Sequence, residues 1–151
     1  GGAHLLQTAA FLASRGFGGS EAQVKLSQQV DLLFYRFPRE LAIYEAAVAA
    51  APTQELIITV QRLKFIGHWI ESSYKMAVMG LFTPTVEQQS AMAEAVGLLV
   101  ETVANLKRLG ALDNLGEIRD ENEQLYLDIV GDSSHAIRGL DLALGLGEVR
   151  Y

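Results

Sequence analysis

The segment from Thr53 to Gly80 constrains the fold more than any other part of the chain. Its apolar residues recur at helical spacing on nearly every side, in two adjoining stripes. The first stripe comprises Leu56, Val60, Leu63, Gly67, Ile70, Tyr74 and Ala77, and the second comprises Ile58, Phe65, Trp69 and Met76. A helix with so much apolar surface needs neighbours on at least two sides. We therefore expect this segment to be the most buried helix, with Trp69 largely out of water.

The N-terminal third of the sequence predicts two helices that can supply such neighbours. One is a short helix over residues 3–15, which has helix-forming composition. The other is a long helix over residues 20–51, in which the apolar phase continues across Pro38, so a kink is expected there and not a break. Ser20 with Gln23 has the spacing of a capping box and predicts where the long helix starts.

The C-terminal half predicts two more long helices. Thr85 and Gln88 form another capping box, which opens a helix ending at Leu109. Asp113 or Asn114 is expected to cap the start of the last helix. Residues 131–134, Gly-Asp-Ser-Ser, can end one helix and cap another, but a partner for helices of about 25 residues needs comparable length. The sequence therefore favours one long helix here.

Four long helices joined by short turns predict an all-α fold, an antiparallel up-down four-helix bundle with a short extra N-terminal helix. A chain of 151 residues has the usual size of one domain, so we expect a single domain over residues 1–151. Gly67 and Gly131 each weaken a helix interior, and close helix packing is the expected compensation at both.

Composition excludes several classes of function. The net charge is −6 and the twelve basic residues form no run, which disfavours a nucleic-acid partner. The absence of cysteine excludes disulfides and thiolate metal sites. No uninterrupted apolar run approaches the roughly 20 residues that cross a bilayer, and no basic region precedes an apolar core at the N-terminus. We expect no membrane span and no signal peptide.

Catalytic signatures are also missing from the sequence. It contains no nucleophile elbow, no dinucleotide or phosphate-binding glycine loop and no His-Glu-x-x-His pair. The Glu-x-x-His pairs of di-iron bundle proteins are missing as well. The sequence therefore favours a non-enzymatic module that senses, binds or bridges partners.

One group of residues has the spacing of a metal site. Asp128, Asp132 and His135 lie at i, i+4 and i+7 and share a face of an unbroken helix. His68 and Glu71, on a narrow polar strip of the central segment, can face them across a groove. Carboxylates and imidazoles in this arrangement can hold a divalent or transition metal.

The alternative interpretation is that both sets of polar residues are solvated surface. Glu71 would then pair with Lys75 on its own helix, and Asp128 and Asp132 would only add solubility. Lys64 and Lys75 share the strip with His68, and their charges oppose a cation site.

The stretch Leu127-Asp128-Ile129-Val130-Gly131-Asp132 resembles the acid-x-x-x-Asp motif of PhoU-type phosphate-signalling regulators. That family consists of antiparallel helical bundles built from a repeated three-helix unit. The resemblance covers about a dozen residues and implies that Asp128 and Asp132 are ligands of a bound iron or zinc cluster. The corresponding stretch of the central segment departs from the motif, because Lys64 and His68 stand where that family has acids.

Large apolar residues offer a second kind of site. A ligand or a partner can contact the aromatic and methionine side chains of the central segment and the turn after it, namely Phe65, Trp69, Met76, Met79 and Phe82. The alternative is that these side chains belong to the core. A bundle with Phe65 and Trp69 in a pocket would carry an apolar small molecule between its helices.

Self-association is expected as well, because 50% of the residues are hydrophobic, which is high for a small domain. The expected contact comprises Leu5, Phe11 and Leu12 of the first helix and the turn over residues 79–82. A protein partner, most economically a second copy of the chain, would cover this surface.

Overall fold

The computed structural model describes residues 2–145, and within them the chain forms helices and turns without any strand. The all-α prediction is confirmed. The elements are α1 (Gly2–Ser14), α2 (Gly19–Ala50), the 3-10 turn η1 (Pro52–Gln54), α3 (Glu55–Val78), α4 (Val86–Arg108), α5 (Leu115–Glu121) and α6 (Glu123–Ala143).

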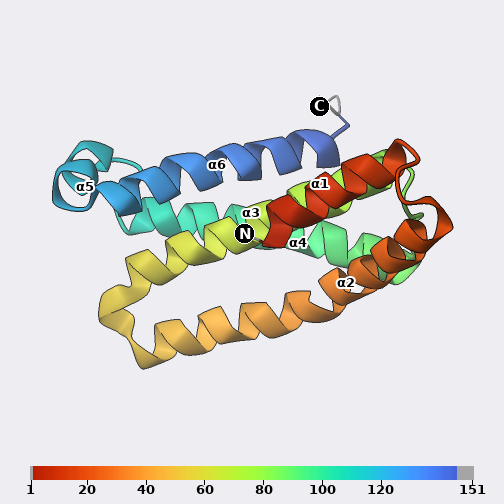
Figure 1. The fold of residues 1–151 in the computed structure, drawn as a ribbon. Helices are drawn as coiled ribbons and strands as arrows, with labels where there is room; N and C mark the ends of the chain where they lie inside the picture. The colour runs from red at the N-terminus through yellow and green to blue at the C-terminus, as the bar shows by residue number, and fades with distance from the viewer. Residues whose placement is uncertain (1, 146–151) are drawn as a thin grey trace.

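Helix α3 is the centre of the fold and contacts α1, α2, α4 and α6 (Figure 1). Eleven of its residues are buried, compared with four or five in each of the other long helices. Trp69 is only 3% exposed. The prediction that this segment is the most buried helix is therefore confirmed.

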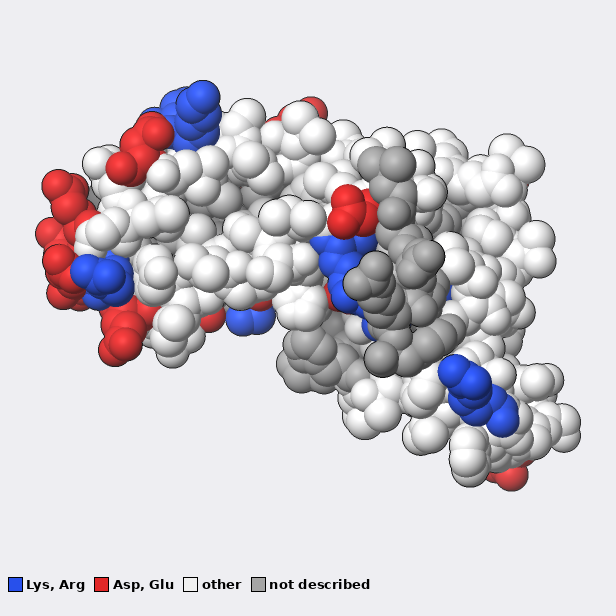
Figure 2. Space-filling view, turned by 90° about the horizontal axis from the view of Figure 1, so that it is seen from above, with Lys and Arg blue, Asp and Glu red and all other residues white. Residues whose placement is uncertain are grey.

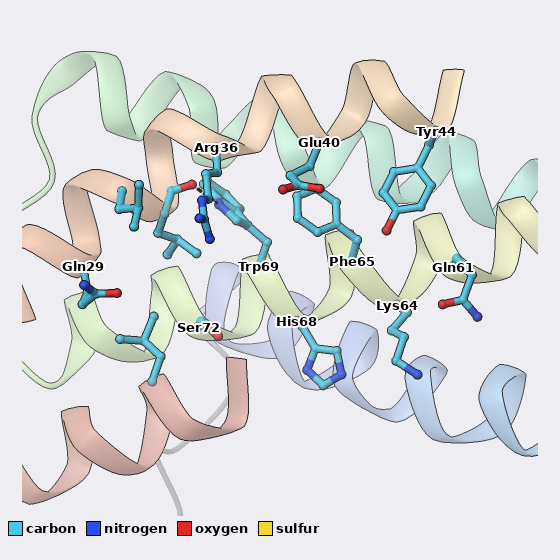
Figure 3. Close-up of a pocket in the computed structure, with 13 residues that line it drawn as sticks. Gln29, Arg36, Glu40, Tyr44, Gln61, Lys64, Phe65, His68, Trp69 and Ser72 are labelled. Carbon is cyan, nitrogen blue, oxygen red and sulfur yellow. Dashed lines mark hydrogen bonds between the residues drawn. The ribbon is translucent and has the colours of Figure 1, made fainter. Parts of the chain in front are cut away.

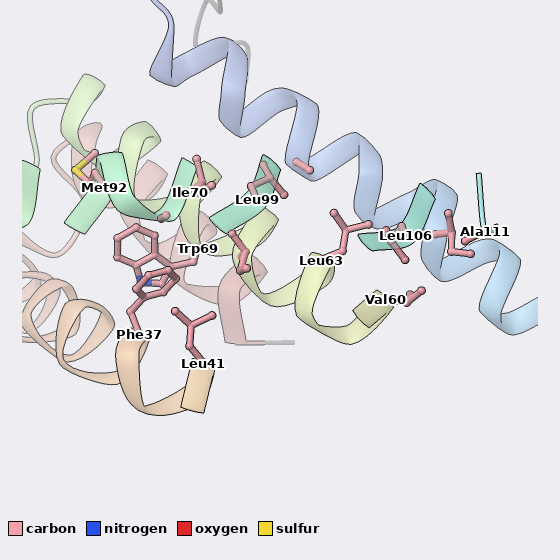
Figure 4. Close-up of a cluster of buried hydrophobic side chains, with 14 residues drawn as sticks. Phe37, Leu41, Val60, Leu63, Trp69, Ile70, Met92, Leu99, Leu106 and Ala111 are labelled. Carbon is pink, nitrogen blue, oxygen red and sulfur yellow. The ribbon is translucent and has the colours of Figure 1, made fainter. Parts of the chain in front are cut away.

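The main core lies along the apolar sides of α3 (Figure 4). Trp69 joins it to α2, since its ring centroid lies 4.1 Å from that of Phe37 and 5.1 Å from that of Phe34. The indole N–H donates a hydrogen bond to the Leu33 carbonyl at 3.1 Å, so the polar atom of this buried ring is satisfied. A smaller cluster packs α1 onto α2 and α3 and comprises Ala10, Ala13, Leu26, Val30 and Met76.

The backbones of α3 and α6 lie unusually close together at two glycines. A Cβ atom on Gly67 would lie 3.1 Å from the backbone nitrogen of Ala136. A Cβ on Gly139 would lie 3.0 Å from the backbone nitrogen of Glu71. Close packing was predicted correctly at Gly67 but wrongly at Gly131, where the same atom would meet nothing within 4 Å.

The capping box predicted at Ser20 is absent, and the last predicted helix starts after Asn114 as expected but is not continuous. Helix α2 begins at Gly19, after Gly18 in the left-handed conformation, and no side chain caps it, so Ser20 lies inside the helix. The last predicted helix is divided into α5 and α6 at Asn122, whose side chain accepts a hydrogen bond from the Leu125 N–H. In contrast, the chain is helical through Gly131 and through Pro38, as expected, and the Thr85 capping box is present.

The apolar residues expected to form a contact surface are only partly exposed. Leu5 and Leu12 are 73% and 44% exposed, whereas Met79 and Phe82 are half-buried against the smaller cluster. On the face shown in Figure 2, acidic side chains gather at the end of the molecule where α5 lies. Within the described part of the chain, no single helix is both long and apolar enough to cross a bilayer. Helices α2 and α3 pass that test only as a pair bent by 115°.

The contacts at the glycines predict that two similar substitutions in helix interiors change the stability of the protein in opposite directions. Gly67→Ala should destabilise the protein by about 1–3 kcal/mol, because the added methyl group meets the backbone of α6. Gly131→Ala should stabilise it by about 0.5–1 kcal/mol, because the methyl group enters open space and alanine favours the helix. Urea melts of both variants measure the difference, and a stabilising Gly67→Ala would contradict the close contact.

Candidate functional site

The polar strip of α3 faces α6, and the five residues singled out as metal ligands lie along this contact. We call the contact the polar seam; it comprises Lys64, His68 and Glu71 of α3 and Asp128, Asp132, His135 and Arg138 of α6. Glu71 is 3% exposed and Asp132 is 5% exposed. The interpretation of these two carboxylates as solvated surface is therefore wrong.

Glu71 is a buried carboxylate of the seam with polar partners from α1 and α6. Its Oε2 atom lies 2.7 Å from Nδ1 of His135, and its Oε1 atom lies 3.3 Å from Nε of Arg138. From α1, Gln7 donates a hydrogen bond to Oε2 at 3.3 Å. Lys75 does not pair with Glu71 in the way the surface interpretation expected; its ammonium donates to Oε1 of Gln7. Buried carboxylates are stabilised by such charge-assisted hydrogen bonds.

The buried carboxylate of Asp132 has longer contacts with its charged neighbours than Glu71 has. Its Oδ1 atom lies 3.7 Å from Nε2 of His68, and its Oδ2 atom lies 3.7 Å from Nζ of Lys64. Both distances are longer than a hydrogen bond. Burial raises the pKa of the Asp132 carboxyl above its ordinary value, and the nearby Asp128 charge adds to this, although Lys64 and His135 oppose it.

Asp128 lies at the more exposed end of the seam and has polar partners of its own. Gln124 donates to its Oδ1 atom at 2.9 Å, and Gln61 donates to Oδ2 at 3.4 Å. Lys64 reaches Oδ1 at 3.7 Å and thus contacts Asp128 and Asp132 together. A cation held by these two carboxylates would have to displace this ammonium group.

The two imidazoles contact each other in the middle of the seam, with their ring planes tilted by 36°. The ring centroids of His68 and His135 are 4.0 Å apart. One ligand atom from each of His68, Glu71 and His135 can be chosen so that the three lie within 4.8 Å of one another. Two imidazole nitrogens and a carboxylate oxygen form a donor set typical of divalent transition metals.

Two residues of the seam region were missed in the sequence. Arg138 follows His135 by three residues and therefore had a helical-spacing signal. Gln7 had none, because its contact with Glu71 depends on how α1 crosses α3.

A pocket of about 480 Å³ lies on another side of α3, between α2, α3 and the end of α1 (Figure 3). Its lining comprises Leu6, Gln29, Leu32, Leu33, Arg36, Glu40, Tyr44, Gln61, Lys64, Phe65, His68, Trp69 and Ser72. Phe65 and Trp69 form part of the lining and also pack in or against the main core, whereas Met76, Met79 and Phe82 belong to the cluster under α1. Lys64 and His68 belong to both the pocket and the seam.

The charged groups of the pocket favour an anion over a cation. Arg36 and Lys64 carry two positive charges, and Glu40 carries the one negative charge of the lining. Burial, together with the Glu40 charge, raises the pKa of Tyr44, so its phenol remains neutral and able to donate a hydrogen bond at neutral pH.

The polar seam predicts that replacing the buried Glu71 destabilises the protein much more than replacing an exposed glutamate. Glu71→Ala should cost about 1.5–3 kcal/mol of unfolding free energy, because it removes charged hydrogen-bond partners from His135 and Arg138. Glu94→Ala, at an exposed position of α4, should stay within about 0.5 kcal/mol. Urea denaturation of both variants measures the two losses of unfolding free energy. Equal losses would mean that Glu71 is solvated after all.

No protein-family model, no curated protein and no solved structure matches this chain. The resemblance to PhoU-type regulators therefore stays a prediction.

Proposed function

We propose that this chain is a non-enzymatic binding module that holds a small apolar or aromatic molecule with one anionic group. The observation that carries the proposal is the pocket of about 480 Å³ between α2 and α3. Small-molecule sites in proteins commonly have volumes of roughly 300–1,000 Å³, apolar walls and a few polar groups that fix orientation.

The walls of the pocket suit the apolar part of such a ligand. Leu33 from α2 and Phe65 and Trp69 from α3 offer aliphatic and aromatic surface. Trp69 is also fixed in place, because its N–H is hydrogen-bonded to the Leu33 carbonyl and its ring packs against Phe37. A rigid aromatic wall loses little side-chain entropy when a ligand binds.

The anionic group of the ligand is assigned to the side of the pocket where Arg36 and Lys64 lie. Lys64 is partly committed to Asp128 and Asp132, whereas Arg36 lies on the exposed side of α2. Arg36 is therefore the better candidate for the charged contact, since a guanidinium can bind a carboxylate, sulfonate or phosphate with two hydrogen bonds.

We also propose that the scaffold of this site is an antiparallel four-helix bundle. The support is the direction of the colour gradient in Figure 1, which alternates along α2, α3, α4 and α6. Short connections between consecutive helices are typical of such bundles.

A PhoU-like metal cluster on Asp128 and Asp132 is a weaker candidate. Lys64 lies 3.7 Å from both carboxylates and occupies the position that a cation would need.

The pocket predicts that the aromatic sulfonate 1-anilinonaphthalene-8-sulfonate binds saturably and that its affinity depends on Arg36. Arg36→Glu should weaken binding by about tenfold or more, because it replaces an attractive charge by a repulsive one. Fluorescence titration measures the affinity, and quenching of Trp69, the single tryptophan, reports contact with the pocket wall.

The matched control is Arg39→Glu, which makes the same charge change at another exposed position of α2, outside the lining. It should change the affinity by less than about threefold, since surface charges away from the site are screened. Equal effects of the two substitutions, or unsaturable binding to the wild type, would contradict the proposal.

A further inference from the structure

We propose that His68, Glu71 and His135 bind one divalent transition-metal ion, such as Zn²⁺, in the polar seam between α3 and α6. This site goes beyond the pocket ligand and does not require it. Glu71 and His135 lie outside the pocket lining, and the ion would be held by side chains of two helices that contact each other independently of α2.

The donor set and its dimensions support a single ion. The three ligand atoms lie within 4.8 Å of one another. Metal–ligand distances of about 2.0–2.2 Å allow donors on one ion to be up to about 4.4 Å apart, so small side-chain rotations suffice. Two imidazoles distinguish the site from those of Mg²⁺ and Ca²⁺, which take oxygen ligands.

The backbone holds the donors in place. Gly67 and Gly139 bring the two helices into near contact on either side of the cluster in sequence, one residue before His68 and four residues after His135. Donors on rigid, closely packed helices need little reorganisation on binding. The same contact excludes most of the water that would otherwise solvate Glu71.

A second layer of contacts orients the carboxylate. Arg138 contacts Oε1 of Glu71, which leaves Oε2 as the atom that faces His135 Nδ1 at 2.7 Å. Such outer contacts to ligating carboxylates are a regular feature of metal sites. The incoming ion would take the place of the hydrogen between Oε2 and Nδ1, and a neutral His135 would then carry its ring hydrogen on Nε2.

The charge of the seam also favours a cation. Three carboxylates, Glu71, Asp128 and Asp132, contact two permanent cations, Lys64 and Arg138, when both imidazoles are neutral. Asp132 is only 5% exposed, and its contacts with Lys64 and His68 are both 3.7 Å long, so the seam compensates its buried charge only in part. A divalent ion at His68 would lie beside this carboxylate, since Asp132 Oδ1 is 3.7 Å from Nε2 of His68.

Titration of the chelator-treated full chain with Zn²⁺ and with Co²⁺ tests the site. We expect one ion per chain by calorimetry, d–d absorption bands with Co²⁺, and no comparable binding of Mg²⁺. His68→Ala and His135→Ala should each weaken Zn²⁺ binding by about tenfold or more. His4→Ala, which changes the third histidine of the chain, is the matched control and should leave the affinity unchanged.

Proton NMR spectra of the wild type test the site even if the alanine variants fail to fold. Addition of Zn²⁺ should move the imidazole signals of two of the three histidines, with the His4 signal identified from His4→Ala. Absence of stoichiometric Zn²⁺ and Co²⁺ binding, or unchanged His68 and His135 signals, would overturn the proposal. The Zn²⁺ titrations contain no pocket ligand, so failure of the pocket proposal and failure of the metal proposal give different results.

Discussion

The near contact between the backbones of α3 and α6 is the constraint on which the rest of the structure depends. A Cβ atom at Gly67 or Gly139 would lie 3.0–3.1 Å from the backbone of the other helix, which is closer than most Cβ contacts in proteins. This closeness removes Glu71 and Asp132 from water. Buried carboxylates are costly unless paired, and the pairing groups, Lys64, Arg138 and the two histidines, are supplied by the same two helices.

Helix α3 lies between the pocket and the polar seam, and the two sites adjoin each other. Its aromatic side, with Phe65 and Trp69, meets α2 and forms the pocket, and its polar side meets α6 and forms the seam. Lys64 and His68 lie where the two sites join. A charged ligand in the pocket therefore acts on the same side chains that compensate Asp132, which gives the two proposed sites a direct physical route for coupling.

Much of the site could be predicted from helical spacing, because residues three, four and seven apart share a face whatever the helix packs against. That rule grouped His68 with Glu71 and Asp128 with Asp132 and His135, and the structure brings both groups together. Spacing could not tell whether the groups faced solvent or each other, nor that Gln7 reaches Glu71 from α1. It also could not distinguish Gly131, which faces open space, from Gly139, which touches α3.

The sequence by itself determined the all-α class, the central place of α3 and the faces on which its polar and aromatic residues lie, since these follow from the local periodicity of apolar residues. Only the tertiary structure decided the assignment of Met76, Met79 and Phe82 to the cluster under α1 and the burial of Glu71. The physical reason is that these outcomes depend on contacts between helices far apart in the chain. Side chains on one helix do not encode how closely a distant helix approaches.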